Sequence, residues 1–222
     1  MGRVAKIARR TFLIGSAAIA GGVAFGYYMY KRPVANPLLD GLAPGEAALT
    51  PYVLIDANGV TLITPRADKG QGAYSVQAAL IAEELDVDLD KVKVDPGPPS
   101  RAYWNTALSG EAVPFPSTDD GAMAETMRGV ANAAVKFFGV QVTGGSTTVP
   151  DSFDKLRIAG AVARETLKAA AAKQAGVSAD RLTTESGAVV LPDGTRLAYE
   201  ELASAAATTD LVTKVALKPR SE

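Results

Sequence analysis

The chain has 222 residues, 47% of them apolar, with 23 basic and 24 acidic side chains and with neither histidine nor cysteine. This composition excludes disulfides, zinc and iron–sulfur sites, thiol nucleophiles and imidazole bases. Any chemistry must therefore come from carboxylates, hydroxyls, amides, lysines or a bound cofactor.

Charge is distributed unevenly along the chain. Residues 1–32 carry six of the basic side chains and no acid, a net charge of +6, which leaves 17 basic and 24 acidic side chains, a net charge of −7, in the rest. An acidic body argues against nucleic acid as a partner, because phosphates need a positive surface.

The N-terminal segment has the features of an export or anchoring signal. Thr11–Tyr30 contains 20 residues without a charge, which as a helix would span about 30 Å, the thickness of a hydrocarbon core. Arg9 and Arg10 stand directly before it and resemble a twin-arginine export signal, with an ordinary signal anchor as the alternative. No clean cleavage site follows. We expect residues 1–32 to be a twin-arginine-like signal or membrane anchor, with the body in the periplasm.

The body is predicted to be α+β, with short mixed sheets packed with helices. Residues 33–50 are a Pro/Gly/Ala-rich linker, and residues 51–222 form the domain. An Asn58-Gly59 turn predicts a hairpin, and alternating or β-branched runs predict strands over 52–56, 60–64, 91–95, 140–143, 181–185, 188–191 and 195–198. Helical spacing predicts helices over 74–85, 122–138, 152–175 and 199–207.

Gly70-Gln71-Gly72, directly before a predicted helix, is the first candidate binding loop. Glycines let a ligand approach the backbone closely, and amide N–H groups at a helix N-terminus favour an anion. The Gln71 amide can both donate and accept. The alternative is a simple turn, which is the commoner meaning of Gly-x-Gly before a helix.

The second candidate loop is Thr143–Thr148, which also precedes a helix. Its backbone and hydroxyl groups could hydrogen-bond a phosphate or the edge of a heteroaromatic ring. The alternative is that its hydroxyls cap the following helix. The sequence does not show whether the two loops meet.

Other polar residues are interpreted as structural. The acidic pairs Glu83-Glu84 and Asp119-Asp120 are expected on solvated surface, and Tyr103 and Trp104 in the core or an interface. The basic side chains of the long helix are expected on its exposed face: Lys155, Arg157, Arg164 and Lys168.

Two runs then carry a resemblance to a known family. Lys69–Val94 (KGQGAYSVQAALIAEELDVDLDKVKV) and Gln141–Ala172 (QVTGGSTTVPDSFDKLRIAGAVARETLKAAAA) resemble, in order and spacing, the molybdopterin-binding subunits of the xanthine dehydrogenase/aldehyde oxidase family. Asn105 and Thr184–Ala203 fit the same pattern. The subgroup most similar to it is the isoquinoline 1-oxidoreductase beta-subunit type, whose members begin with a twin-arginine-like leader.

The resemblance implies a molybdenum hydroxylase that acts on an N-heteroaromatic or an aldehyde with oxygen from water. The cofactor would be molybdopterin cytosine dinucleotide, whose pterin supplies the sulfur ligands, so the missing cysteine and histidine do not exclude it. By this resemblance Gly70, Gln71 and Gly72 would hold the pterin or its phosphates. Its other side would be lined by Gly144, Gly145, Ser146, Thr147 and Thr148.

The resemblance implies as partners a [2Fe–2S] small subunit, a cytochrome c electron acceptor and the remainder of the molybdopterin subunit, and the N-terminal apolar segment adds the membrane. The family's catalytic glutamate lies near the C-terminus of a much longer chain, and no segment here matches it, so no catalytic residue is assigned. We therefore expect residues 51–222 to be a partial molybdopterin-binding domain, from a truncated or split subunit. The alternative is a membrane-anchored, non-catalytic assembly module that retains the fold.

Overall fold

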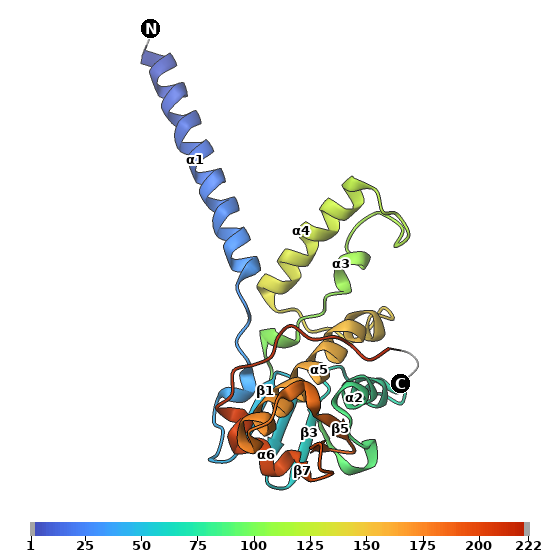
Figure 1. The fold of residues 1–222 in the computed structure, drawn as a ribbon. Helices are drawn as coiled ribbons and strands as arrows, with labels where there is room; N and C mark the ends of the chain where they lie inside the picture. The colour runs from blue at the N-terminus through green and yellow to red at the C-terminus, as the bar shows by residue number, and fades with distance from the viewer. Residues whose placement is uncertain (1–2, 220–222) are drawn as a thin grey trace.

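The computed structural model describes residues 3–219 and confirms the α+β class (Figure 1). A four-stranded sheet has the order β1 (Ala47–Thr50), β2 (Val53–Asp56), β3 (Gly59–Ile63) and β4 (Lys93–Asp95). The first three strands are antiparallel, and β4 runs parallel to β3.

Two features of this sheet follow from local sequence. The predicted hairpin joins β2 and β3, where Asp56 pairs with Gly59 and the φ of Gly59 is 133°, a value that a residue with a Cβ rarely adopts. Helix α2 (Ala73–Leu85) makes the crossover that a parallel pair requires, between β3 and β4. Strand β1 was not predicted; it lies within the segment expected to be a linker, and Ala47 is fully buried.

The second sheet is an antiparallel meander of β5 (Thr183–Glu185), β6 (Ala188–Val190) and β7 (Arg196–Ala198), as predicted. The other α-helices are α1 (Arg3–Lys31), α3 (Leu108–Glu111), α4 (Ala122–Phe138), α5 (Thr148–Ala175) and α6 (Tyr199–Ala207). Short 3-10 turns occur at Pro37–Leu39, Leu89–Lys91, Arg101–Tyr103 and Ala179–Arg181. Helices α4 and α5 end where predicted, at Gly139 and Gly176, which adopt the left-handed conformation.

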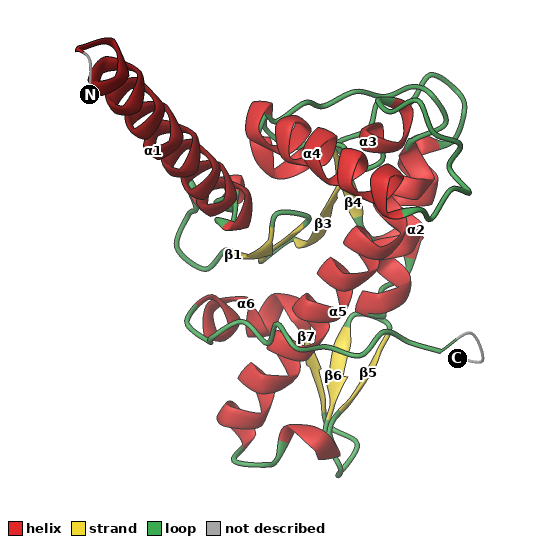
Figure 2. Ribbon diagram, turned by 90° about the horizontal axis from the view of Figure 1, so that it is seen from above, coloured by secondary structure: helices red, strands yellow, loops and turns green. Residues whose placement is uncertain are grey.

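Helices α5 and α6 contact strands of both sheets and so join them into one core (Figure 2). Helix α2 packs along α5, and Gly160 permits their close approach. A Cβ added at Gly160 would lie 2.5 Å from the carbonyl oxygen of Ile81. Tyr103 is buried in the same core, as expected.

Helices α1 and α4 project from this body (Figure 1). Among residues 3–219, no helix meets the combined requirements of length and apolar character for crossing a membrane. The side chains of the proposed twin-arginine pair, Arg9 and Arg10, lie outside the described part of the structure.

The predicted strand over residues 140–143 does not form. Its backbone is instead held by one residue of a distant loop: the N–H of Asn105 donates to Val140 O at 2.9 Å, and Asn105 Nδ2 donates to Val142 O at 2.9 Å. The segment is thus an irregular stretch pinned by an asparagine.

The expectation that Glu84 is solvated is wrong. Its side chain is fully buried, and its carboxylate accepts from Arg157 Nε at 2.9 Å and pairs with Arg164 Nη1 at 3.4 Å. The long-helix cations are likewise not on an open face, since their side chains are only 10–21% exposed. A buried carboxylate needs such partners, because an unpaired buried charge is costly.

Candidate functional site

The Gly70-Gln71-Gly72 loop is closed by its own side chains. Gln71 Nε2 donates to Ala67 O at 2.8 Å, and Gln71 Oε1 accepts from Lys69 N at 2.5 Å. Both ends of the Gln71 amide are therefore engaged within the loop, and a ligand that used this side chain would compete with those bonds.

The N-terminus of α2 is also occupied, by Asp68. Its carboxylate accepts from Tyr74 N at 2.9 Å and from Gly70 N at 2.7 Å. Hydrogen bonds from the Tyr74 and Gly70 N–H groups, in that order, lower the pKa of Asp68, so it is negatively charged at neutral pH. A fixed negative charge at this place disfavours a phosphate and leaves room for an uncharged ligand edge.

The second loop presents unused donors. Gly145 and Ser146 both have positive φ, 59° and 58°, and both residues are exposed. Within residues 3–219 neither of their N–H groups, nor the Ser146 hydroxyl, has an acceptor in the chain. These donors are therefore open to water or to a ligand.

Thr147 supports this loop but does not cap the helix through its hydroxyl, since it is the N-cap residue of α5 without a side-chain capping hydrogen bond. It is buried, and its hydroxyl donates to Gly144 O at 2.7 Å and accepts from Asn105 Nδ2 at 2.9 Å. Thr148 begins α5 and is half-buried. The five predicted residues thus divide into exposed Gly144, Gly145 and Ser146 and a supporting Thr147–Thr148 pair.

The structure brings the two loops together. Ala67 N donates to Thr143 Oγ1 at 2.9 Å, and Ala67 O is the acceptor of the Gln71 side chain. Gln71 is therefore connected to the start of the second loop by two hydrogen bonds, both of which pass through the backbone of Ala67.

A buried ion pair lies beneath this junction. Arg66 Nε and Nη2 donate to Asp151 Oδ2 at 3.0 and 2.6 Å, and the two side chains are 1% and 3% exposed. Arg66 immediately precedes the Ala67 that contacts Thr143, and Asp151 lies in the first turn of α5. The pair therefore fixes both loops to one buried point.

Further hydrogen bonds complete this network. Asp151 Oδ1 accepts from Thr106 N at 2.7 Å and from Lys155 Nζ at 2.5 Å. Burial raises the pKa of Asp151, but the charges of Lys155 and Arg66 outweigh it and hold that pKa below its ordinary value. Burial likewise lowers the pKa of Lys155, against the opposing effect of Asp151. Gln77 Oε1 accepts from Arg66 N at 3.2 Å and so ties α2 to the same point.

Sequence reasoning did not identify Arg66 or Asp151. Arg66 stands among Pro, Asp, Lys and Gly, which is the composition of a loop, and Asp151 resembles an ordinary acid in a helix's first turn. A lone arginine shortly after an apolar strand was the one available signal.

The chain matches no protein-family model. It is 31% identical over 188 residues to isoquinoline 1-oxidoreductase subunit beta of Brevundimonas diminuta, covering 83% of this chain and 20% of that one. It is 28% identical over 229 residues to membrane-bound aldehyde dehydrogenase [pyrroloquinoline-quinone] of Gluconacetobacter polyoxogenes, covering 98% and 24%. The resemblance to molybdopterin-binding oxidoreductases is confirmed. The chain spans a fifth to a quarter of the length of these relatives.

A solved structure, quinoline 2-oxidoreductase from Pseudomonas putida 86, matches 69% of this chain and 15% of its own, with 17% identity and a TM-score of 0.37. A likeness at this level carries no argument about the site. The similarity to the molybdopterin-binding family therefore depends on the sequence relatives.

Proposed function

We propose that this chain supplies part of the cofactor cradle of a molybdenum-dependent oxidoreductase. The observation that carries the proposal is the hydrogen bond from Ala67 N to Thr143 Oγ1, which joins the two loops that the sequence marked independently. Convergence of two glycine loops, one with free donors, is what a large ring-shaped ligand needs.

The residues fit the ring of a pterin better than its phosphates. Gly144, Gly145 and Ser146 offer exposed N–H and hydroxyl donors, and Gly70, Gln71 and Gly72 offer an amide and open backbone. Asp68 places a negative charge beside the first loop, so the phosphates of a cytosine dinucleotide would be held elsewhere. When bound, the cofactor would supply the redox chemistry of hydroxylation with oxygen from water, while the chain binds and orients it.

The rest of the functional assignment follows the relatives. An N-heteroaromatic or aldehyde substrate, a [2Fe–2S] small subunit, a cytochrome c acceptor and the remainder of the molybdopterin subunit are proposed from their names and from the family resemblance. The twin-arginine-like pair and the uncharged run Thr11–Tyr30 are the grounds for proposing a periplasmic body anchored to the membrane, although no helix among residues 3–219 meets the requirements for crossing one. The second candidate function is a non-catalytic assembly module, which the internal engagement of Gln71 favours.

The cofactor content of the purified protein distinguishes the cofactor-cradle function from the assembly-module function. The chain would be co-expressed with its neighbouring genes and purified, and molybdenum and pterin would be measured per polypeptide, together with pyrroloquinoline quinone because one relative is named for it. The cofactor-cradle proposal predicts near-stoichiometric molybdenum. Absence of molybdenum under every pairing would favour the assembly module.

Ser146→Ala is the sharper variant, because it removes a hydroxyl that has no hydrogen-bond partner among residues 3–219. It should lower molybdenum occupancy without changing the unfolding midpoint. Ser178→Ala, at the start of a distant 3-10 turn where the hydroxyl donates to Asp180, is the control for removing a serine hydroxyl elsewhere and should leave occupancy unchanged. Equal occupancy in both variants would remove Ser146 from the cradle.

A further inference from the structure

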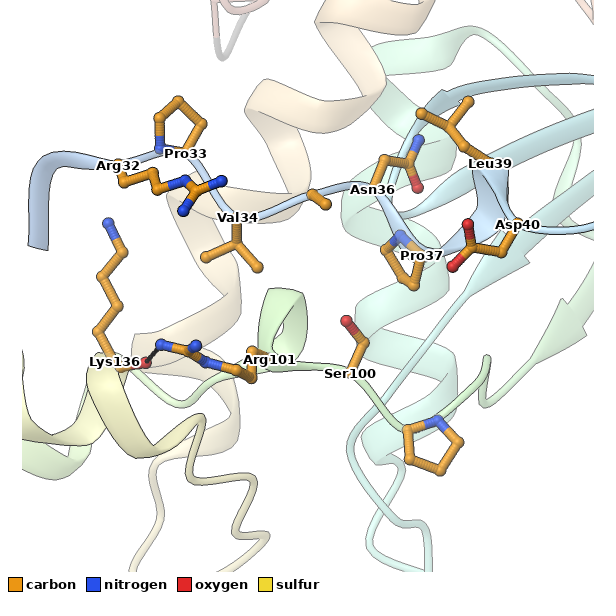
Figure 3. A pocket seen from close by; sticks show the side chains of 12 residues that line it. Arg32, Pro33, Val34, Asn36, Pro37, Leu39, Asp40, Ser100, Arg101 and Lys136 are labelled. Carbon is orange, nitrogen blue, oxygen red and sulfur yellow. Dashed lines mark hydrogen bonds between the residues drawn. The ribbon is translucent and has the colours of Figure 1, made fainter. Parts of the chain in front are cut away.

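A cavity of about 720 Å³ lies where the segment after α1 passes the loop at Pro99–Arg101 and the last turn of α4 (Figure 3). It shares no lining residue with the glycine loops, although Gln141, just before the second loop, donates to the carbonyl oxygen of its lining residue Ser100 at 2.6 Å. Three separate chain segments form its walls, and each contributes a cationic side chain: Arg32, Arg101 and Lys136.

The three cations gather at one end of the cavity, and the only acid in the lining, Asp40, stands at the other (Figure 3). Within residues 3–219 none of the three cations forms an ion pair. Arg101 Nη2 donates weakly to Lys136 O at 3.4 Å, and Lys136 Nζ donates to the carbonyl oxygen of Tyr30.

These positive charges repel one another. Burial, and then the charges of Lys31 and Arg101, lower the pKa of Lys136. An anion at this end of the cavity would relieve the repulsion and would occupy donors that now have few acceptors. Arg32 belongs to the basic segment 1–32, whereas Arg101 and Lys136 are cations of the acidic remainder of the chain.

We propose that this cavity binds a phosphate group, carried either by an anionic phospholipid headgroup or by a soluble phosphate ester. Phosphate has enough acceptor oxygens to bond two guanidinium forks and an ammonium together, which a carboxylate has not. The volume exceeds that of the phosphate alone and leaves room for the group it esterifies. The cavity adjoins the end of α1, where Tyr27 and Tyr28 are exposed, as at a membrane interface.

The single tryptophan provides a direct probe. The ring centroid of Trp104 lies 6.0 Å from Lys136 Nζ, so an anion bound there should change its fluorescence. The full chain would be titrated with inorganic phosphate and, separately, with vesicles of phosphatidylglycerol in phosphatidylcholine, with pure phosphatidylcholine as the comparison. We expect a saturable change that weakens at high salt. A response to inorganic phosphate shows that a soluble phosphate group is sufficient, and a response to phosphatidylglycerol vesicles alone identifies a lipid headgroup.

Arg101→Gln and Lys136→Gln should each weaken binding about tenfold, since each removes a charge-assisted hydrogen bond. Lys173→Gln, an exposed lysine in the last turn of α5, is the charge-matched control and should bind as the unmodified chain does. Lys136 Nζ also donates to the carbonyl oxygen of Tyr30 in α1, so Lys136→Gln removes that contact as well. Arg101→Gln leaves the contact with α1 intact and therefore tests the cavity alone. Unchanged affinity in Arg101→Gln, an equal loss in Lys173→Gln, or no response to either probe would overturn the proposal.

Discussion

Asp151→Asn tests whether the buried ion pair holds the two loops in place. Asp151 accepts hydrogen bonds from five donors, on Arg66, Thr106 and Lys155. Asparagine keeps the shape but loses the charge, and its NH₂ group would face donors. Arg66 would then be a buried cation without a counter-charge, which costs about 3–5 kcal/mol when one partner of a buried pair is removed.

Urea unfolding followed by Trp104 fluorescence measures this loss. With an m-value of about 2 kcal/mol per M, the midpoint should fall by about 2 M. The matched control is Glu185→Gln, which removes the partner of Arg196 from an ion pair whose side chains are 68% and 46% exposed. An exposed pair contributes at most about 1 kcal/mol. If Asp151→Asn lost no more stability than Glu185→Gln, the assigned role of the buried pair would be refuted.

The difference in unfolding free energy between the unmodified chain and Asp151→Asn should depend on pH, and the direction of that dependence follows from the pKa of Asp151. The folded-state pKa of Asp151 lies below its ordinary value of about 3.9. The stability that its charge contributes is therefore fully present above the unfolded pKa and is lost as pH falls through the lower folded pKa. The gap between the unmodified chain and Asp151→Asn should be constant from about pH 5 to 7 and should close below about pH 4.

Four further variants test packing and local hydrogen bonds. Gly160→Ala should destabilise by about 1–3 kcal/mol by overpacking the α2–α5 contact, whereas Gly129→Ala, in α4 with open space around it, should stabilise by about 0.5–1 kcal/mol; chemical unfolding measures both. Tyr199→Phe should cost about 1 kcal/mol in the same assay, because the buried hydroxyl donates to Leu85 O at 2.7 Å and burial, which raises the pKa of Tyr199, keeps it protonated. Asp68→Ala should accelerate amide hydrogen exchange in the first turn of α2, and unchanged exchange would contradict the cap assigned to it.

Elements defined by local signals could be predicted from sequence. The β2–β3 hairpin follows from Asn58-Gly59, and the ends of α4 and α5 follow from Gly139 and Gly176. Strand β1 lacked such a signal, because Ala47–Thr50 has no β-branched run and is a strand only through its pairing with β2. The failed strand after α4 is the opposite case, a β-like sequence whose hydrogen bonds go to Asn105.

In the candidate site, too, some features follow from local sequence and others depend on contacts between distant residues. Both loops were visible as glycine-rich turns before helices, but their junction depends on Arg66 and Asp151, which are 85 positions apart. No periodicity links such a pair, and the same holds for buried Glu84 and Arg157, 73 positions apart. Charged residues were assigned to the surface because single charges usually are there, and only the fold supplies the partner that permits burial.

The placement of the buried pair has a consequence for how the loops would respond to a ligand. Arg66 and Asp151 are anchored by Gln77 on α2 and by Thr106 and Lys155, so neither can shift without breaking several buried bonds. The loop tips above them, Gly70–Gly72 and Gly144–Ser146, carry exposed residues. A base fixed by several buried hydrogen bonds keeps the entropy cost of binding low, because the two loops are already held together before a ligand arrives. The cradle's competence is therefore expected to depend more on the concealed pair than on any single glycine.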